Sequence, residues 1–338
     1  MPTDPQAPPT PPARARRWPR RVAVTLAVVL VGGAGLYLRN SSTIAGREEG
    51  QRPFLLAHRG IAQTFDLAGV TADTCTARII HPPQVPHLEN TLPSLRAAFD
   101  AGADQAEIDV QLTRDGQLAV FHDATLDCRT DGTGTVGEHT MDELRRLDIG
   151  YGYTSDNGTS FPLRGSGVGL LPTVAEVFAA LPGRAFKVDL KRDQQADGDA
   201  LADFLGTLPA DRLATVTVTG GDTAVAAVRR RLPQVRTASR ATIKSCLIDY
   251  AGIGWTGHVP DSCRHLELPL PARYGRWLWG WPNLFVARMR GVDTRVVLVR
   301  GEGEWSAGFD TPADLAELPD GWTGGIWTNR VDVIAQDR

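Results

Sequence analysis

The chain has 338 residues, 42% of them apolar and 22% charged, which excludes a wholly disordered or fibrous protein. Five arginines and one aspartate give residues 1–21 a charge of +4, so a total of −3 leaves −7 on the rest of the chain. A body this acidic binds polyanions poorly, because affinity for nucleic acids comes mainly from cations that neutralise phosphates. We therefore expect no nucleic-acid partner.

A basic tail and an apolar run open the chain. We expect a disordered tail over 1–21, a transmembrane segment over 22–38 and a polar linker over 39–52. Two interpretations remain open: a signal anchor that holds the next domain at the cell membrane outside the cytoplasm, or a cleaved signal that releases it. The anchor is favoured, since the small residues 43–45, where cleavage would occur, lie far from the apolar run.

Export would place the four cysteines in an oxidising environment, where an even number favours pairing. We favour disulfides between Cys75 and Cys128 and between Cys246 and Cys263. The second pair closes a short loop, and the first joins two segments near the site predicted below. Four buried thiols are the alternative.

Nine short β-rich runs alternate with helical stretches over residues 53–338, where no break of linker length occurs. They are 54–58, 105–112, 118–122, 185–191, 214–219, 235–239, 265–270, 295–299 and 325–328. Such alternation is typical of a parallel α/β fold. It favours one domain, an eight-stranded (β/α) barrel of the TIM type with one run outside it. Which run lies outside stays open.

Helix starts carry recognisable caps. Thr140 with Glu143, and Thr173 with Glu176, have capping-box spacing, and Thr311 stands directly before a proline. These signals predict three helix N-termini.

The run 105–112 has an unusual polar face. A strand's period of two places Glu107, Asp109 and Gln111 on one side. Neighbouring carboxylates repel each other unless a cation lies between them, and a hard divalent metal ion suits oxygen ligands. The alternative is an edge strand whose polar face is solvated.

The run 185–191 repeats this arrangement with Lys187, Asp189 and Lys191 on one side. Asp189 could provide a third carboxylate, and either lysine could face an anionic substrate. The alternative is a surface ladder of charges.

Two histidines end predicted strands: His58, followed by Arg59, and His122, followed by Asp123. Polar residues at the carboxyl ends of barrel strands surround the active sites of such folds. Two imidazoles at equivalent strand ends can divide the roles of proton acceptor and donor, and an arginine suits phosphate oxygens. We therefore predict catalytic roles for both histidines.

Five motifs follow one another between residues 58 and 123. They are His58-Arg59-Gly60, Glu89-Asn90-Thr91, Glu107-Ile108-Asp109-Val110, Thr113-Arg114-Asp115-Gly116 and Val120-Phe121-His122-Asp123. In this order they resemble the glycerophosphodiester phosphodiesterase family. The resemblance is dense over 54–191 and thin afterwards, although 325–330 is similar to the family's last strand.

The resemblance implies a (β/α) barrel with an inserted subdomain over about 125–171. It implies general base and acid roles for His58 and His122. It also implies a Ca²⁺ or Mg²⁺ ion held by Glu107, Asp109 and Asp189, and substrate phosphate bound by Arg59 and Lys191. Glu89 would join the metal ligands or orient Arg59.

Three features depart from the family pattern. Asp189 stands where Glu is usual, which shortens the third ligand by one methylene group, and Asn329 stands where Asp is usual. An insertion over 67–87 would border the pocket.

Trp277, Trp279, Trp281 and Phe285 form an aromatic cluster around Pro282. Such a cluster can contact a lipid tail or a membrane interface, and a loop packed on the barrel is the favoured interpretation.

The sequence thus predicts an exported, metal-dependent hydrolase of a small glycerophosphodiester, which it cleaves to glycerol phosphate and an alcohol. Two alternatives stay open. One is cleavage of lipid head groups of the lysophospholipase D or sphingomyelinase D type. The other is a binding protein on a barrel that lost catalysis through Asp189 and Asn329.

Overall fold

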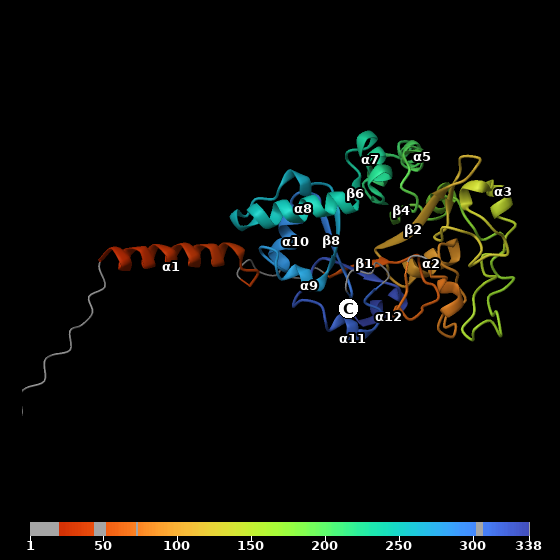
Figure 1. The fold of residues 1–338 in the computed structure, drawn as a ribbon, viewed down its shortest axis with the longest axis horizontal. Helices are drawn as coiled ribbons and strands as arrows, with labels where there is room; N and C mark the ends of the chain where they lie inside the picture. Colours follow the sequence, from red (N-terminus) through yellow and green to blue (C-terminus); the bar gives the residue numbers. More distant parts are fainter. Residues whose placement is uncertain (1–19, 44–51, 72–73, 302–306, 338) are drawn as a thin grey trace, which may run out of the picture.

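Eight parallel strands form the centre of the computed structural model, which describes residues 20–43, 52–71, 74–301 and 307–337 (Figure 1). They are β1 (Phe54–Ala57), β2 (Gln105–Leu112), β4 (Ala185–Leu190), β5 (Val216–Gly220), β6 (Arg236–Ala238), β7 (Glu267–Pro271), β8 (Arg295–Val299) and β9 (Gly325–Thr328). Their hydrogen-bonded order is β6-β5-β4-β2-β1-β9-β8-β7. A parallel bridge between Thr237 and Leu266 joins the two ends, so the predicted barrel is confirmed.

The ninth strand, β3 (Leu118–Val120), pairs antiparallel with β2. It is the run outside the barrel that the sequence left unidentified. His122 follows β3 and therefore does not end a barrel strand equivalent to β1, so the predicted equivalence of the two histidine positions is wrong. It approaches the site from a returning hairpin strand instead.

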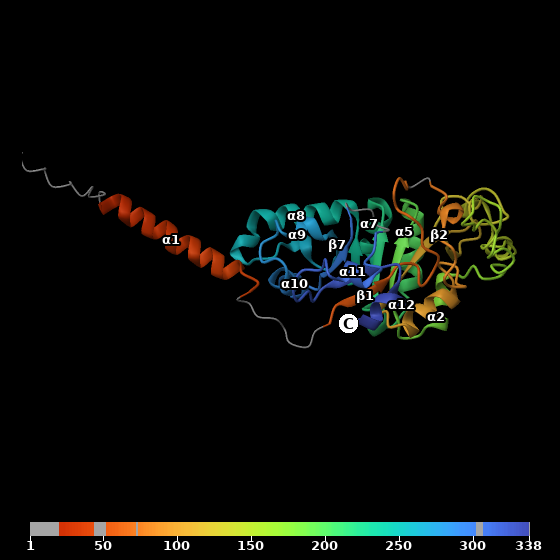
Figure 2. The same ribbon diagram turned by 90° about the horizontal axis from the view of Figure 1, so that it is seen from below.

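Helices surround the barrel in the order expected for β/α units (Figures 1 and 2). They are α2 (Leu92–Asp100), α4 (Val174–Ala180), α5 (Gln195–Leu205), α6 (Ala210–Leu213), α7 (Asp222–Arg231), α8 (Arg240–Ile253), α9 (Ala272–Gly275), α10 (Asn283–Arg290), α11 (Pro312–Leu315) and α12 (Val331–Ile334). A further short helix, α3 (Met141–Leu144), lies between β3 and α4. Thr140, Thr173 and Thr311 accept hydrogen bonds from the third residue of α3, α4 and α11, as their capping signals predict.

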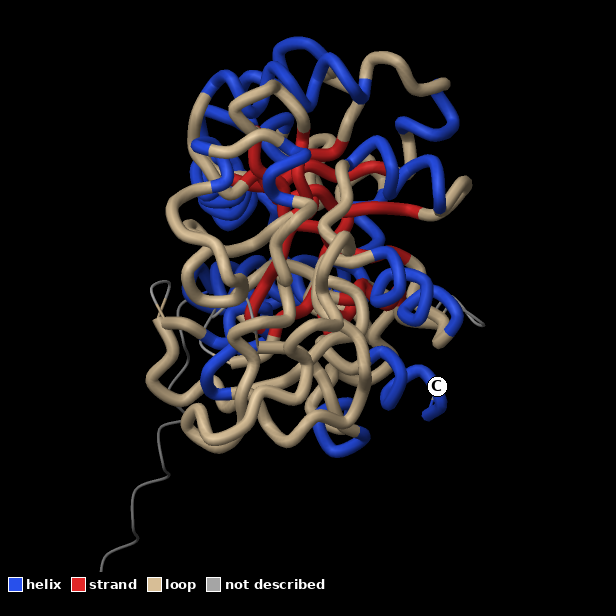
Figure 3. The backbone as a smooth tube through the Cα atoms, turned by 90° about the vertical axis from the view of Figure 1, so that its right-hand side faces the viewer, coloured by secondary structure: helices blue, strands red, loops and turns tan. Residues whose placement is uncertain are grey.

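The barrel and the β3–α4 connection have separate apolar cores. The larger core lies between strands and helices, where Phe186 contacts Phe99 and Phe178. The smaller core joins the 3-10 helix η1 (Thr76–Ile79) to residues 119–171. This second region consists mainly of loops, which are drawn in tan in Figure 3.

Both disulfides that the sequence favoured are present, Cys75–Cys128 and Cys246–Cys263. The first connects the insertion over 67–87 with the β3–α4 connection.

The apolar helix α1 (Arg20–Asn40) projects from the body along its long axis (Figures 1 and 2). Its span Val22–Asn40 has a mean hydropathy of 1.9 and is not buried by other described residues. It is long and apolar enough to cross a membrane, as the run 22–38 predicts. Most of the predicted tail (1–19) and of the linker (44–51) lies outside the described residues.

Candidate active site

Three carboxylates meet where β2 pairs with β4. Glu107, Asp109 and Asp189 each offer an oxygen within 4.8 Å of the others. Glu107 and Asp109 are 3% and 1% exposed, since β2 lies between β1 and β4 in the barrel wall. The solvated edge strand is therefore excluded. Asp109 and Asp189 are register partners on adjacent strands, so the structure brings together the three predicted ligands.

Protein donors hold Asp109 ionised. Asn90 makes two hydrogen bonds with Asp109. Its amide nitrogen donates to Asp109 Oδ2 at 2.7 Å, and its amide oxygen accepts the Asp109 backbone N–H at 3.0 Å. Arg59 Nε lies 3.2 Å from Oδ2, and Lys191 Nζ lies 3.4 Å from Oδ1. Burial alone would raise the pKa of Asp109, but the charges of Lys191 and Arg59 lower it below the ordinary value.

Glu107 is in the opposite situation. Burial and the charge of Asp109 raise its pKa well above the ordinary value. Its Oε2 is buried without a hydrogen-bond partner among the described residues, and the ring nitrogen Nε2 of His58 lies 3.9 Å away. A buried carboxylate oxygen with no donor is costly, so this position fits a cation that the protein itself does not supply.

Asp189 is half-buried and held from both sides. Thr219 donates to its Oδ1 at 2.8 Å, and Lys191 Nζ lies 3.2 Å from its Oδ2. The shorter side chain therefore reaches the cluster. Three hard oxygen donors, two of which have an oxygen without a hydrogen bond among the described residues, form a set that Ca²⁺ or Mg²⁺ prefers.

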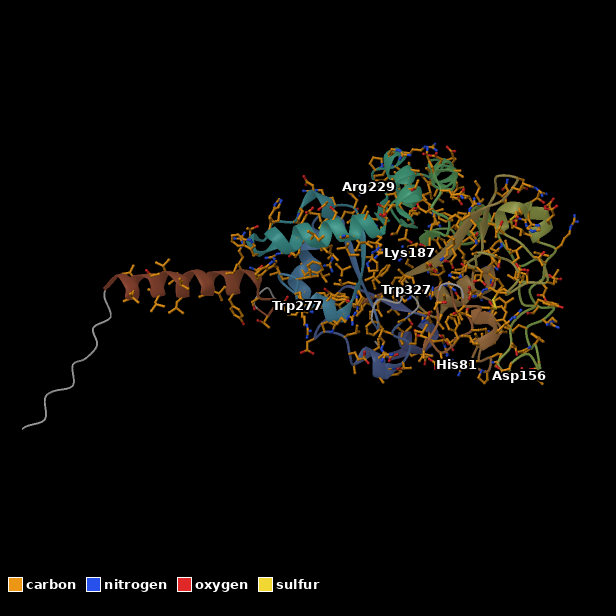
Figure 4. All side chains as sticks on the ribbon, viewed as in Figure 1. His81, Asp156, Lys187, Arg229, Trp277 and Trp327 are labelled. Atoms are coloured by element: carbon orange, nitrogen blue, oxygen red, sulfur yellow. A yellow bond between two sulfur atoms is a disulfide. The ribbon has the colours of Figure 1, made fainter. Side chains whose placement is uncertain are left out.

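Lys187 does not face the mouth of the barrel. Its Nζ lies 3.1 Å from Glu267 Oε1 and 4.6 Å from the centre of the Trp327 ring, inside the barrel (Figure 4). Of the two lysines considered for an anionic substrate, only Lys191 lies among the three carboxylates.

His58 is buried and hydrogen-bonded through Nδ1 to Asn329 Oδ1 at 2.6 Å. The Asn329 amide donates in turn to Asp310 Oδ2 at 2.8 Å. This orientation leaves the amide oxygen toward His58, so Nδ1 carries the proton and Nε2 is free toward Glu107. Burial and then the charge of Arg59 lower the pKa of His58, which keeps the imidazole neutral.

His122 is oriented by a carboxylate, whereas His58 is oriented by an amide. Its Nδ1 lies 2.7 Å from Asp123 Oδ1, and Arg129 Nε donates to Asp123 Oδ2 at 2.8 Å. The carboxylate thus orients the ring with Nε2 away from Asp123. Burial lowers the pKa of His122, while Asp109 and the bond to Asp123 oppose that shift.

A chain of charges supports Arg59. Glu89 lies between Arg59 Nη1 and Arg129 Nη1, at 3.0 Å from each. Glu89 therefore orients Arg59 and is not among the clustered carboxylates. Arg59 itself has a left-handed backbone (φ 59°) in a tight turn, and a Cβ on the next residue, Gly60, would clash with Ser94. The turn after β1 thus requires glycine behind the arginine.

Sequence reasoning missed two supporting residues, Arg129 and Asp310. Arg129 is 3% exposed and reaches Asp123, Glu89, Tyr153 and Thr76. No local pattern marks it, because its partners come from four separate segments. Asn329 was noticed only as a departure from a family pattern, and its contact with His58 required the barrel to close.

A small pocket at this mouth is lined by His58, Arg59, Gln63, Glu89 and Asn329, among others. A larger cavity lies at the opposite end of the barrel, beside Phe54, Arg295 and Gly325. Those residues begin β1, β8 and β9, whereas barrel enzymes carry their sites at the strands' carboxyl ends. The small pocket, which His58 and Arg59 line, therefore borders the candidate site.

Residues 58–201 match the model of the glycerophosphoryl diester phosphodiesterase family. A glycerophosphodiester phosphodiesterase of Caldanaerobacter subterraneus subsp. tengcongensis is 39% identical over 103 residues, which cover 30% of this chain and 39% of that protein. A probable glycerophosphodiester phosphodiesterase 1 of Mycobacterium tuberculosis is 37% identical over 98 residues, 29% of this chain and 28% of that one. The chain thus spans well under half the length of these relatives.

Solved structures agree over a longer stretch. The glycerophosphodiester phosphodiesterase of Agrobacterium tumefaciens has a TM-score of 0.55 at 20% identity and covers 84% of this chain and 100% of its own. A phosphodiesterase of Oleispira antarctica in complex with the product sn-glycerol-3-phosphate has a TM-score of 0.55 at 18% identity, covering 85% and 97%. At such identities the likeness shows the fold.

Proposed function

We propose that this chain, whose residues 58–201 match the glycerophosphoryl diester phosphodiesterase family model, hydrolyses a glycerophosphodiester to glycerol phosphate and an alcohol. The observation that carries the proposal is the cluster of Glu107, Asp109 and Asp189 beside two oriented histidines. A site of this kind can bind a phosphodiester, accept one proton and donate another.

The carboxylates would hold a divalent cation, Ca²⁺ or Mg²⁺. Its chemistry when bound is charge neutralisation and polarisation of phosphoryl oxygens. The fit rests on the unpaired Glu107 Oε2, on Asp109 Oδ1, which also lacks a hydrogen bond among the described residues, and on the 4.8 Å cluster. The choice between the two metals is part of the proposal's test.

His58 is proposed as the general base. Its neutral state and its free Nε2 suit it to accept a proton from a substrate hydroxyl group or a water molecule. Asn329 holds the ring through a neutral amide, which fixes the tautomer without adding a negative charge. Asn329 therefore supports this role and is no sign of lost catalysis.

His122 is proposed as the general acid. The Asp123 carboxylate at Nδ1 stabilises the protonated imidazole, which can then donate from Nε2 to the leaving oxygen. His122 is also the more exposed histidine, with a side chain 25% accessible against 7% for His58. An alcohol can therefore depart from its side of the site.

Arg59 and Lys191 would bind the phosphate. Both cations lie beside Asp109, and their surplus N–H donors can point to phosphoryl oxygens. Glu89 and Arg129 keep the Arg59 guanidinium in place.

The test is hydrolysis by the purified full-length chain in detergent. The substrate panel contains glycerophosphodiesters and lysolipids, each assayed with EDTA and after addition of Ca²⁺ or Mg²⁺. Preference for lysolipids would favour the lipid head-group alternative, and binding without turnover under any metal would favour the binding protein. Release of glycerol phosphate from a soluble diester supports the proposal.

We further propose that α1 anchors the barrel at the cell membrane with the catalytic site outside the cytoplasm. The arginines before α1 favour a cytoplasmic N-terminus, and the two disulfides suit an oxidising compartment. Retention of the full chain in alkaline-washed membranes, together with protease access to the barrel in intact cells, would support it. Release into the medium would favour a cleaved signal.

A further inference from the structure

Exposed apolar side chains gather on one side of the barrel. Outside α1, eight large apolar side chains are exposed in the described part of the chain, and five of them lie between residues 248 and 277. These five are Ile248, Ile253, Trp255, Tyr274 and Trp277, which we call the aromatic face. Scattered exposed residues are ordinary, but five within thirty positions indicate a surface with a partner.

The aromatic cluster predicted from sequence divides between core and surface. Trp281 and Phe285 pack together in the barrel's outer layer, and the Trp279 indole donates to the carbonyl oxygen of Ala251. Trp279, Trp281 and Phe285 therefore pack against the barrel, as the favoured interpretation predicts. Trp277, however, is 72% exposed, the highest value among the described large apolar side chains outside α1.

The segment around Trp277, which includes α9 and α10, has a charge opposite to that of the whole chain. Residues 268–292 contain four arginines and no acidic residue, although the chain carries −3 in total. Arg273 and Arg276 are exposed and lie 4.5 Å and 5.2 Å from the ring centres of Tyr274 and Trp277. Aromatic rings beside guanidinium groups suit the interface of an anionic bilayer, where rings occupy the headgroup level.

The end of α1 is fixed to this same region. Ser42 donates to the carbonyl oxygen of Gly280 at 2.6 Å and accepts the Leu284 N–H at 3.0 Å. Asn40 donates to the carbonyl oxygen of Trp255 at 2.9 Å, and Arg288 donates to Asn40 Oδ1 at 3.0 Å. In both ribbon views the end of α8 lies beside the end of α1 (Figures 1 and 2). The aromatic face therefore lies beside the point where α1 leaves the body.

We propose that the aromatic face docks onto the anionic phospholipid surface of the membrane that α1 crosses. This inference rests on the proposed anchoring by α1 and adds a second, surface contact. Docking would turn the β7–β8 side of the barrel toward the bilayer. The loops between β3 and α4, near Asp156 at the far end in Figure 4, would then point away from it.

The experiment uses single introduced cysteines in the full chain, because all four native cysteines are in disulfides. Ile253→Cys and Tyr274→Cys report on the face, and Val168→Cys, at a position 56% exposed in the β3–α4 connection, is the matched control. Each variant carries a bimane label and is placed in nanodiscs of phosphatidylcholine with or without phosphatidylglycerol. Quenching by shallow brominated lipids measures contact with the bilayer, and quenching by iodide measures contact with water.

We expect lipid quenching at positions 253 and 274 to exceed that at 168 by about twofold or more, with the opposite order for iodide. The difference should be larger in anionic discs, and Arg273→Gln/Arg276→Gln should reduce it. Equal lipid quenching at all three positions, or no dependence on anionic lipid, would overturn the proposal. Alkaline extraction of the same chain reports on α1 separately. A chain that stays in the disc without quenching refutes docking alone, and a chain that is extracted refutes both docking and anchoring.

Discussion

Two buried glutamates inside one barrel have opposite surroundings. Glu267 on β7 is fully buried, with Lys187 Nζ 3.1 Å from one oxygen and Arg295 Nη1 3.8 Å from the other. Glu107 on β2 is buried almost as deeply, yet its nearest ion-pair partner is His58 at 3.9 Å, and Asp109 on the same face adds repulsion. Lys187 neutralises Glu267 at ion-pair distance, whereas the charges of Arg59 and Lys187 act on Glu107 from farther away and do not offset its burial and the charge of Asp109.

This difference separates a structural charge from a functional one. A buried charge that has its own partners contributes to the fold, and removing one partner leaves the other uncompensated. A buried charge without partners lowers stability unless something outside the chain binds it. The contrast between Glu107 and Glu267 therefore tests the metal proposal without relying on turnover alone.

The largest expected effect follows metal removal. EDTA should reduce hydrolysis to the uncatalysed background, and Ca²⁺ or Mg²⁺ should restore it. Saturating metal at about a hundred times Kd should also raise the free energy of unfolding by about 2.7 kcal/mol. Calorimetry of wild type and Glu107→Gln checks this, since the variant should lose most of the increase. Full activity in excess EDTA would refute the metal assignment.

Loss of either histidine should follow in size. His58→Ala and His122→Ala should each lower kcat about 10² to 10⁴-fold, the usual contribution of general acid-base catalysis. Thermal melting should stay near that of wild type. His265→Ala, at an exposed position just before β7, is the control and should keep normal kcat. A histidine variant that melts normally and turns over at the wild-type rate would show that its proposed role is wrong.

Replacing the two glutamates should have different effects on the free energy of unfolding. Glu267→Gln leaves Lys187 without its carboxylate and should cost about 3 to 5 kcal/mol in free energy of unfolding. Metal binding by the folded fraction should persist. Glu107→Gln, without metal, should leave stability unchanged or raise it, because it removes repulsion with Asp109. Denaturant titration of both variants in EDTA distinguishes the two cases, and equal losses would contradict the comparison.

The smallest effect is expected at Asp189. Asp189→Asn should weaken metal affinity by about tenfold or more, as expected for loss of a carboxylate from a hard-ion site. Asp123→Asn is the control, since Asp123 binds His122 and Arg129 instead. Asp189→Glu decides whether the shorter side chain is adapted: weaker binding indicates a site built for Asp, and tighter binding indicates an eroded ligand. Identical metal titrations for wild type and both Asp189 variants would show that Asp189 does not touch the ion.

Local sequence patterns predicted much of this molecule. All nine β-rich runs contain strands, three helix caps form as their spacing indicates, and the apolar run is a helix. The alternation in 105–112 also places Glu107 and Asp109 on one face of their strand, as predicted. These features depend on strand period, hydrogen bonding within a turn and helix length, so a short stretch of chain is enough to determine them.

Tertiary structure decided the rest. Only strand pairing shows that β3 runs antiparallel and brings His122 in from a hairpin. Only barrel closure places Asn329 on His58 and turns Lys187 toward Glu267. Only the packing of the β3–α4 connection surrounds Arg129 with partners from separate segments. Buried polar groups must find partners wherever the fold places them, and those partners are far apart in the chain. The residue types that can carry out the chemistry can therefore be identified from the sequence. The contacts that set their charge and orientation form only in the folded protein.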